Sequence, residues 1–239
     1  IAEYLNSFTA PLWKLINDLG KKNKTIVFEG AQGSMLDIDF GTYPYVTSSN
    51  TLSGQIFSGT GFGLRNHHKI LGITKAYTTR VGSGPFPTEL NDSVGDHLGQ
   101  KGQEFGTVTK RKRRCGWFDS VLLKQTIKLN GITDIVLTKL DVLDELKKIN
   151  VCVGYNIQGK EYDYLPNQEY LYDKIKPMYK EINGWQVSTA GINNFNQLPD
   201  NAKIYIQILE ELIEANISII STGPERKETI DLNGMLLDI

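Results

Sequence analysis

The sequence predicts an α/β protein with a largely parallel central sheet, flanking helices and long functional loops. Two short runs of β-branched and aliphatic residues, at 135–138 and 217–220, have the length and composition of buried strands. Segments with apolar residues at three- and four-residue steps lie between such runs, as helices do in α/β folds. Polar or glycine-rich turns follow the strands, and in open sheets ligands bind at the carboxyl ends of the strands.

The N-terminal part is expected to hold a helical segment and the first strand. Apolar residues recur at helical steps between residues 5 and 19, where Pro11 begins a second turn or kinks the first. Gly20 and the lysines after it end the helix. Residues 25–28 then form a buried strand that leads into a glycine-rich turn at 29–34.

The remaining elements follow from the same patterns. Residues 41–63 form a long polar loop, and loops of this length inside a compact chain are usually functional. Asp119 is the expected N-cap of a helix that begins at residue 120. The tyrosine-, lysine- and proline-rich segment 156–183 is interpreted as a surface excursion, so that residues 1–239 form a single α/β domain. Further strands are expected at 70–77 and 151–153, a turn at 80–87, and helices at 120–129 and 204–215.

Composition excludes several classes of protein. The 239 residues carry 26 basic and 27 acidic side chains, whereas a surface that follows nucleic-acid phosphates needs an excess of cations. No run of 18 apolar residues and no basic stretch before an apolar one is present, so neither a membrane span nor a secretory leader is expected. The two cysteines, Cys115 and Cys152, cannot form a disulfide framework and suit a reducing, cytoplasmic location.

Two glycine-containing clusters are candidates for binding an anion or a nucleotide. In the first, at 30–33, glycines let the backbone approach a ligand, and Gln32 offers a donor and an acceptor to a purine edge. A tight strand-to-helix turn is the alternative interpretation. In the second, at 106–114, five consecutive cations repel one another unless an anion lies among them. This cluster is either a loop that closes on a carboxylate or phosphate, a solvated basic turn, or a localisation signal.

Two further clusters follow predicted strands. Thr138-Lys139-Leu140-Asp141 resembles the guanine-reading element of GTP-binding proteins, in which the carboxylate accepts from the ring N–H and exocyclic amine while the lysine stem covers the base. A simple helix start is the alternative. Residues 221–224, Ser-Thr-Gly-Pro, could close the same pocket with hydroxyl and backbone groups.

Other binding motifs are missing from the sequence. No Gly-x-x-x-x-Gly-Lys-Ser/Thr phosphate loop is present. The histidines His67, His68 and His97 are not spaced as metal ligands, so no metal site is expected in this chain.

Taken together, these strings resemble those of one family, adenylosuccinate synthetase. The match begins with Phe-Glu-Gly-Ala-Gln-Gly at 28–33 and keeps the family's order and spacing over nearly the whole chain after the first helix. The other matching segments are 36–50, 75–82, 84–89, 113–119, 138–144 and 220–226.

The resemblance implies a P-loop-NTPase-like α/β fold, here incomplete, and a cytoplasmic homodimer that serves AMP biosynthesis. The family joins IMP to L-aspartate with GTP as co-substrate and Mg²⁺ as cofactor. GTP first phosphorylates the purine 6-oxygen, and the amine of aspartate then displaces phosphate. This order is chemically reasonable because a carbonyl oxygen is a poor leaving group until it is phosphorylated, and cations stabilise the charge that develops.

The resemblance also assigns site residues. Gln32 would contact hypoxanthine, Thr47 the 5′-phosphate, and Val81 the ribose, while Lys139 and Asp141 would read guanine. Lys110 stands where the family usually has glycine. The full sets are Gln32, Thr47, Val81 and Arg111 for IMP; Thr107, Val108, Thr109, Lys110, Arg111 and Arg113 for the aspartate loop; and Arg113, Lys139, Leu140, Asp141, Ser221, Thr222 and Gly223 for GTP.

The family's catalytic groups have no counterpart among these 239 residues. The family's phosphate-loop string, Gly-Asp-Glu-Gly-Lys-Gly-Lys, is not present, and the chain opens with Ile1. The chain is therefore expected to be the C-terminal part of the enzyme, with the catalytic aspartate and histidine in a missing N-terminal half and negligible turnover alone. The alternatives are a noncatalytic purine-nucleotide-binding module and, more remotely, a protein whose basic run at 110–114 docks nucleic acid.

Overall fold

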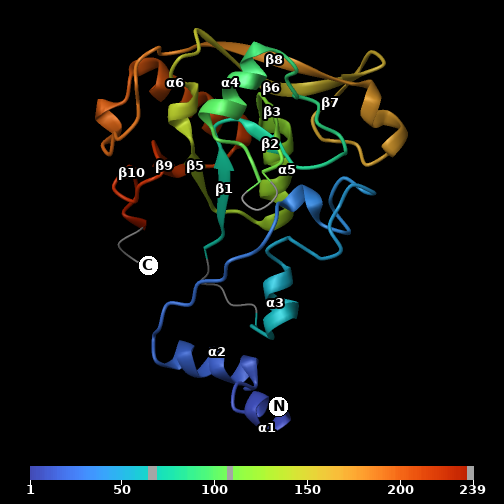
Figure 1. Ribbon diagram of the computed structural model, residues 1–239, viewed down its shortest axis with the longest axis vertical. Coiled ribbons are helices and arrows are strands. Elements are labelled where there is room, and N and C mark those ends of the chain that lie inside the picture. Colours follow the sequence, from blue (N-terminus) through green and yellow to red (C-terminus); the bar gives the residue numbers. More distant parts are fainter. Residues whose placement is uncertain (64–68, 107–109, 236–239) are drawn as a thin grey trace.

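A four-stranded sheet carries the strand ends at which the candidate residues lie (Figure 1). The computed structural model describes residues 1–63, 69–106 and 110–235. The strands β1 (Leu71–Lys75), β5 (Asp134–Thr138) and β9 (Ile217–Ser221) are parallel neighbours, and β10 (Thr229–Asp231) pairs antiparallel with β9. The predicted largely parallel sheet is confirmed. Because β5 and β9 are parallel neighbours, the polar strings that follow them emerge at the same edge of the sheet.

A second sheet is built around β6 (Lys148–Ile157), which contains the strand expected at 151–153. Its partners are β4 (Phe118–Asp119), β7 (Lys160–Tyr162) and β8 (Ile175–Asn183), and β8 pairs antiparallel with β6 from end to end. The interpretation of 156–183 as a surface excursion is therefore wrong for the parts that lie in strands, which are the end of β6, all of β7 and all of β8. One face of an antiparallel strand can stay in water, so a strand such as β8 tolerates lysine and glutamate and looks like a loop in sequence.

Three longer helices flank these sheets, and two of them were predicted. The helix α5 (Ser120–Asn130) begins at its N-cap Asp119, whose carboxylate accepts from the backbone N–H of Leu122 at 3.0 Å. It ends at Gly131, where a φ of +64° requires the left-handed conformation that glycine adopts without cost. The other two are α4 (Ser93–Lys101) and α6 (Asp200–Ile213), and the short 3₁₀ turns are η1 (Ser34–Leu36), η2 (Leu140–Leu143), η3 (Glu169–Lys174) and η4 (Phe195–Gln197).

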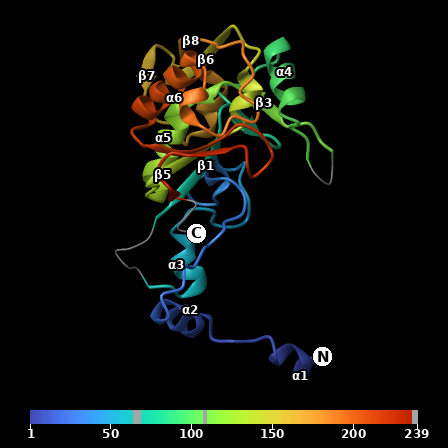
Figure 2. The ribbon, with the colours of Figure 1, turned by 90° about the vertical axis from the view of Figure 1, so that its left-hand side faces the viewer.

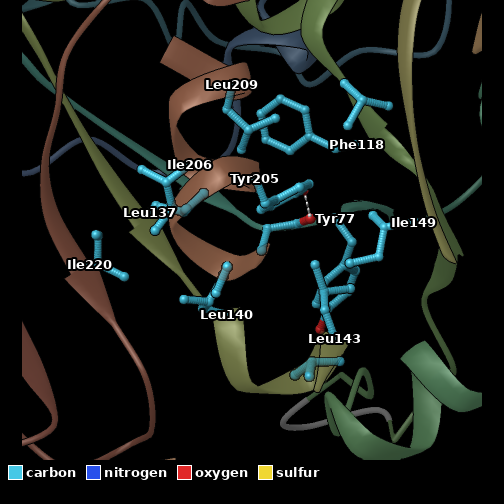
Figure 3. Close-up of a cluster of buried hydrophobic side chains, with 14 of the residues drawn as sticks. Tyr77, Phe118, Leu137, Leu140, Leu143, Ile149, Tyr205, Ile206, Leu209 and Ile220 are labelled. Atoms are coloured by element: carbon cyan, nitrogen blue, oxygen red, sulfur yellow. Dashed lines mark hydrogen bonds between the residues drawn. The ribbon is translucent and has the colours of Figure 1, made fainter. Parts of the chain in front are cut away.

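One hydrophobic cluster joins both sheets to α6 (Figure 3). Leu137 of β5 and Ile149 of β6 both belong to it, and both are almost fully buried. The α6 residue Tyr205 is also buried, and its hydroxyl donates to the carbonyl of Ala76 at 2.7 Å. This bond ties the helix to the segment that follows β1, so the core supports the sheet edge where the candidate residues lie. A small antiparallel pair, β2 (Thr78–Arg80) and β3 (Arg114–Gly116), adjoins this edge.

The N-terminal segment lies apart from the two sheets (Figures 1 and 2). Its helices are α1 (Ala2–Asn6) and α2 (Leu12–Lys21), and Pro11 is the N-cap of α2, so the helical segment expected here is divided into two helices before the proline. The strand expected at 25–28 is wrong: this stretch has no strand structure, and Val27 is 67% exposed. A strand exists only where a neighbour completes its backbone hydrogen bonds, and none of the described strands pairs with this stretch. The short helix α3 (Gln55–Thr60) lies within the long loop that was predicted at 41–63.

The N-cap carboxyl Asp119 gives the fold a pH dependence. Asp119 is buried, and its second oxygen accepts from the hydroxyl of Tyr155 at 2.7 Å. Burial raises the pKa of Asp119 from 3.8 to about 6, although its hydrogen bonds oppose the rise. Between these two values the folded protein binds a proton that the unfolded chain does not, so stability falls as the pH rises through this window.

We therefore predict that Asp119→Asn, which keeps a capping side chain, stabilises the protein at pH 7 by about 1–3 kcal/mol and changes little at pH 4. Urea unfolding at the two pH values measures this difference. Asp200→Asn, at an exposed position in the first turn of α6, is the matched control and should leave the pH profile unchanged. An equal effect of Asp119→Asn at both pH values would contradict the assignment.

Candidate functional site

A buried carboxylate gathers the cations at the edge of the main sheet. Glu104 lies just beyond α4 and is inaccessible to solvent. Its Oε1 accepts from the hydroxyl of Tyr77 at 2.6 Å and from Nζ of Lys139 at 3.1 Å. Its Oε2 accepts from Nζ of Lys75 at 2.8 Å and from the guanidinium of Arg113 at 2.9 Å. Two predicted site residues, Lys139 and Arg113, therefore share one carboxylate.

The electrostatics of this cluster favour an anion. Burial on its own raises the pKa of Glu104, but hydrogen bonds from Lys75 and Tyr77 outweigh it and lower that pKa to about 2. Glu104 is therefore charged at neutral pH. Three cations against one carboxylate leave two positive charges in excess, and the side chains of Lys139 and Arg113 remain 35% and 31% exposed. The excess charge can thus reach a ligand that approaches the sheet edge.

The string 138–141 spans the end of β5 and the start of η2. Lys139 adopts a left-handed conformation with a φ of +60°, and its ammonium also donates to the carbonyl of Gly102. Leu140 is fully buried and begins η2, so it can face a ligand only through its backbone. Asp141 is half-buried, and burial raises the pKa of its carboxyl.

The fourth cluster follows β9, the parallel neighbour of β5. The hydroxyl of Ser221 donates to the carbonyl of Gly223 at 2.8 Å. Thr222 is fully buried, and its hydroxyl donates to the carbonyls of Ile192 and Glu228 at 2.7 and 3.1 Å. Thr222 therefore holds the turn from inside, whereas Ser221 and Gly223 stay partly exposed. A Cβ at position 223 would meet only the carboxylate of Glu228, the flexible end of a side chain that would have to move aside.

The first cluster brings two predicted residues into contact. Gln32 donates through Nε2 to the hydroxyl of Thr47 at 3.2 Å, although the two residues are 15 positions apart. The loop between them is organised by Asp37, which is buried. Asp37 accepts from the backbone N–H groups of Phe40 at 3.0 Å and Thr51 at 2.6 Å. Burial alone would raise the pKa of Asp37, but these and two further backbone bonds lower it.

Val81 lies at the end of β2 and is exposed. Arg80, immediately before it, donates to the hydroxyl of Thr42 at 2.9 Å and to the carbonyl of Tyr45 at 3.1 Å. This clamp joins the end of β2 to the loop that carries Thr47. The structure thus places Val81 beside the same loop as two other predicted IMP residues.

Most of the basic run is neutralised by the protein's own carboxylates. Lys112 pairs with Asp96 at 2.6 Å, Arg113 with Glu104, and Arg114 with Glu89. The anion that the run was expected to need is therefore largely supplied from within the chain.

A tight turn joins the two ends of the basic loop. Lys110, with a φ of +54°, donates its N–H to the carbonyl of Gly106 at 2.9 Å, and the N–H of Gly106 donates to the carbonyl of Arg111 at 2.8 Å. Both Lys110 and Arg111 are exposed. The remaining predicted loop residues, Thr107, Val108 and Thr109, lie outside the described residues.

The sequence analysis missed Glu104 and Asp37, although each organises a cluster that it identified. For Glu104 a signal existed, because it is the acidic residue that most closely precedes the run of five cations at 110–114. For Asp37 no such signal is visible, since its acceptor role depends on backbone N–H groups up to 15 residues away.

A polar cavity of about 350 Å³ lies away from the predicted site residues. It separates the turn at 84–87 from η3 and includes Glu89, Arg114, Glu169 and Asp173 in its lining. Within the described ranges, no group of three or more His, Cys, Asp or Glu side chains is placed to hold a metal ion. Across the same ranges, no helix is both long and apolar enough to cross a bilayer.

A largely parallel sheet with cations and polar strings at the carboxyl ends of its strands defines an α/β protein whose candidate ligand site lies at one edge of the sheet. Comparison with known proteins gives the family. The model of the adenylosuccinate synthetase family matches residues 1–230, and the chain belongs to this family.

Solved structures agree with this membership. The fully ligated adenylosuccinate synthetase of Plasmodium falciparum superimposes with a TM-score of 0.91 and 42% sequence identity, over 95% of this chain and 55% of that one. The succinoaminodeoxyadenylate synthetase of cyanophage S-2L, bound to dGMP and dATP, is 18% identical with a TM-score of 0.58, over 92% of this chain and 49% of that one. This second likeness concerns the fold alone. The chain spans about half the length of either relative.

The buried cluster around Glu104 predicts acid lability. Because the pKa of Glu104 lies near 2 in the folded protein and near 4.5 unfolded, its contribution to stability is complete above pH 4.5 and disappears as the pH falls towards 2. The expected loss is on the order of 3 kcal/mol.

We predict that Tyr77→Phe, which removes one hydrogen bond to Glu104, raises the pKa of this carboxyl and moves acid unfolding to a higher pH. Circular dichroism during acid titration measures the midpoint. The control is Tyr45→Phe, which removes a longer, exposed contact with Glu169 at 3.4 Å and should not move it. If both variants unfold at the wild-type pH, Tyr77 does not support the charge of Glu104.

Proposed function

We propose that this chain contributes the nucleotide- and aspartate-binding part of a GTP-dependent ligase that joins IMP and L-aspartate to form adenylosuccinate in AMP biosynthesis. Family membership over residues 1–230 supports the reaction. The site assignment rests on one observation: Lys139 and Arg113 both form ion pairs with Glu104. This shared partner joins the proposed guanine pocket to the proposed aspartate loop.

The proposed chemistry takes place in two steps. The γ-phosphoryl group of GTP is transferred to the 6-oxygen of IMP, which turns a poor leaving group into a good one. The amine of aspartate then attacks carbon 6, and phosphate leaves with its bonding electrons. Negative charge lies on the transferred phosphoryl group in the first step and on the leaving phosphate in the second. The excess of cations around Glu104 is suited to stabilise this charge.

The IMP site is proposed to consist of Gln32, Thr47, Val81 and Arg111. The hydrogen bond between Gln32 and Thr47 supports a common site for the base and the phosphate of one nucleotide. The hydrogen bonds from Arg80 to the loop that carries Thr47 support a position for Val81 next to Gln32 and Thr47.

The GTP site is proposed to comprise Arg113, Lys139, Leu140, Asp141, Ser221, Thr222 and Gly223. Asp141 would accept from guanine, Leu140 would contribute its backbone, and Thr222 would shape the turn without touching the ligand. Arg113 Nε is a buried donor with no acceptor among the described residues, and a ligand oxygen would satisfy it.

Aspartate is proposed to bind the loop formed by Thr107, Val108, Thr109, Lys110, Arg111 and Arg113. The exposure of Lys110 and Arg111 supports a ligand-facing role. Lys110 fits the backbone of this loop less well than glycine, because a φ of +54° costs a residue with a Cβ about 1 kcal/mol.

The homodimer, the cytoplasmic location and the single-domain organisation of residues 1–239 belong to the same proposal. The free, buried cysteines Cys115 and Cys152 support a reducing compartment, and the cluster shared by both sheets supports a single domain. Mg²⁺ is proposed as a cofactor of the whole enzyme, and none of the roles proposed for the residues of this chain involves it.

A second candidate, a noncatalytic purine-nucleotide-binding module, is favoured by one observation. The residues proposed for the guanine and purine pockets all lie within this chain, and they could bind nucleotides without turnover. Binding without turnover by this polypeptide alone fits both candidates.

The first prediction of the proposal concerns turnover. Phosphate release from GTP should stay at background when the purified chain is given IMP, aspartate and Mg²⁺, while calorimetry detects GDP and IMP binding. Omission of each component in turn is the control. Release that requires all four components would show that this polypeptide holds the catalytic groups, and would end the second candidate.

The second prediction concerns the base. Asp141→Asn should lower GDP affinity roughly tenfold or more, because the carboxylate that accepts two guanine N–H groups is lost. The same variant should gain affinity for xanthosine diphosphate, whose 2-carbonyl accepts from an amide. Calorimetry with both nucleotides measures the change, and Glu145→Gln, at an exposed neighbour, is the control. Unchanged GDP affinity in Asp141→Asn would remove Asp141 from the guanine pocket.

A further inference from the structure

Glu104 is not among the ligand-binding residues proposed above, yet it touches two of them. Its Oε1 accepts from Lys139 and its Oε2 from Arg113, at 3.1 and 2.9 Å. Since Glu104 is fully buried, it cannot contact a nucleotide itself. Its contacts with the proposed ligand-binding residues are made through these two cations.

The backbone around Glu104 is fixed independently of its side chain. The N–H of Glu104 donates to the carbonyl of Gly99 at 2.9 Å, and its carbonyl accepts from the N–H of Arg113 at 2.8 Å. The hydroxyl of Tyr77, itself buried, orients Oε1 from a third direction. The carboxylate is therefore held in one place before any ligand arrives.

A lysine without such a partner would be free to move. The four-carbon stem of Lys139 has many rotamers, and Asp141 lies only two residues further on. Burial raises the pKa of the Asp141 carboxyl, and the charge of Lys139 opposes that rise. If Lys139 paired with Asp141, it would occupy the acceptor that guanine needs. Glu104, together with the carbonyl of Gly102, holds the ammonium elsewhere.

We infer that Glu104 is a positioning residue for guanine selectivity: it keeps Lys139 away from Asp141 and ties the guanine pocket to Arg113 of the basic loop. The inference rests on the proposed function, because it assumes that Asp141 reads guanine. It goes further by naming a buried residue on which that selectivity depends.

The test compares GDP with inosine diphosphate, which lacks the exocyclic amine of guanine but keeps the ring N–H. In Glu104→Gln we expect GDP affinity to fall roughly tenfold and the affinity for inosine diphosphate to fall less, so that their ratio moves towards one. Competition calorimetry at a temperature where circular dichroism shows the variant folded measures both constants.

The ratio separates positioning from a purely structural role. Partial unfolding lowers both affinities by the same factor, because only the folded fraction binds, and so it leaves the ratio unchanged. Glu89→Gln is the matched control, since Glu89 is a partly buried carboxylate paired with Arg114, and its ratio should equal that of wild type.

Glu104→Asp is the second variant if Glu104→Gln does not fold. It keeps the charge but is one methylene shorter and cannot reach both Lys139 and Arg113, so an intermediate ratio is expected. If the wild-type chain binds GDP and the folded variants keep its ratio of GDP affinity to inosine diphosphate affinity, the inference is overturned. A wild-type chain that binds no GDP would instead overturn the proposed function, and with it the basis of this inference.

Discussion

Four segments of the chain meet on the carboxylate of Glu104: the ends of β1 and β5, the start of β3 and the residues after α4. A buried carboxylate without partners is costly, and removal of this one would leave three cations facing one another. The hydrogen bonds around it therefore constrain each segment to one position. Both the sheet edge and the basic loop depend on that constraint.

Asp37 organises the loop between Gln32 and Thr47, as Glu104 organises the cations at the sheet edge. It is a buried carboxylate satisfied by backbone N–H groups, and it gives a fixed shape to a segment without regular structure. Arg80 then ties this loop to β2. The contact between Gln32 and Thr47 is a consequence of this ordering, since a loose loop would not hold them together. Both halves of the candidate site are thus built on buried polar groups and not on apolar packing alone.

The basic run illustrates how structure changes the meaning of a sequence pattern. Five adjacent cations suggest a surface for polyanions, but three of them, Lys112, Arg113 and Arg114, pair with carboxylates from other parts of the chain. What remains is a local excess of positive charge beside Lys139, on a chain whose net charge is only −1. Such a focused charge suits a small anionic ligand better than an extended one.

The sequence by itself determined the positions of the strands β5 and β9 and the helix α5 with its cap Asp119, because their residue composition and periodicity are visible within a few neighbouring positions. It also determined the family, through strings whose order and spacing extend along the chain. Only the tertiary structure decided that residues 25–28 form no strand and that β8 pairs with β6, since strands exist through distant partners. The same holds for Glu104, whose Oε1 joins residues 27 and 35 positions away. Hydrogen bonds of that kind depend on where the folded chain brings distant donors together. The local sequence shows only that Glu104 precedes a run of cations, not which donors it meets.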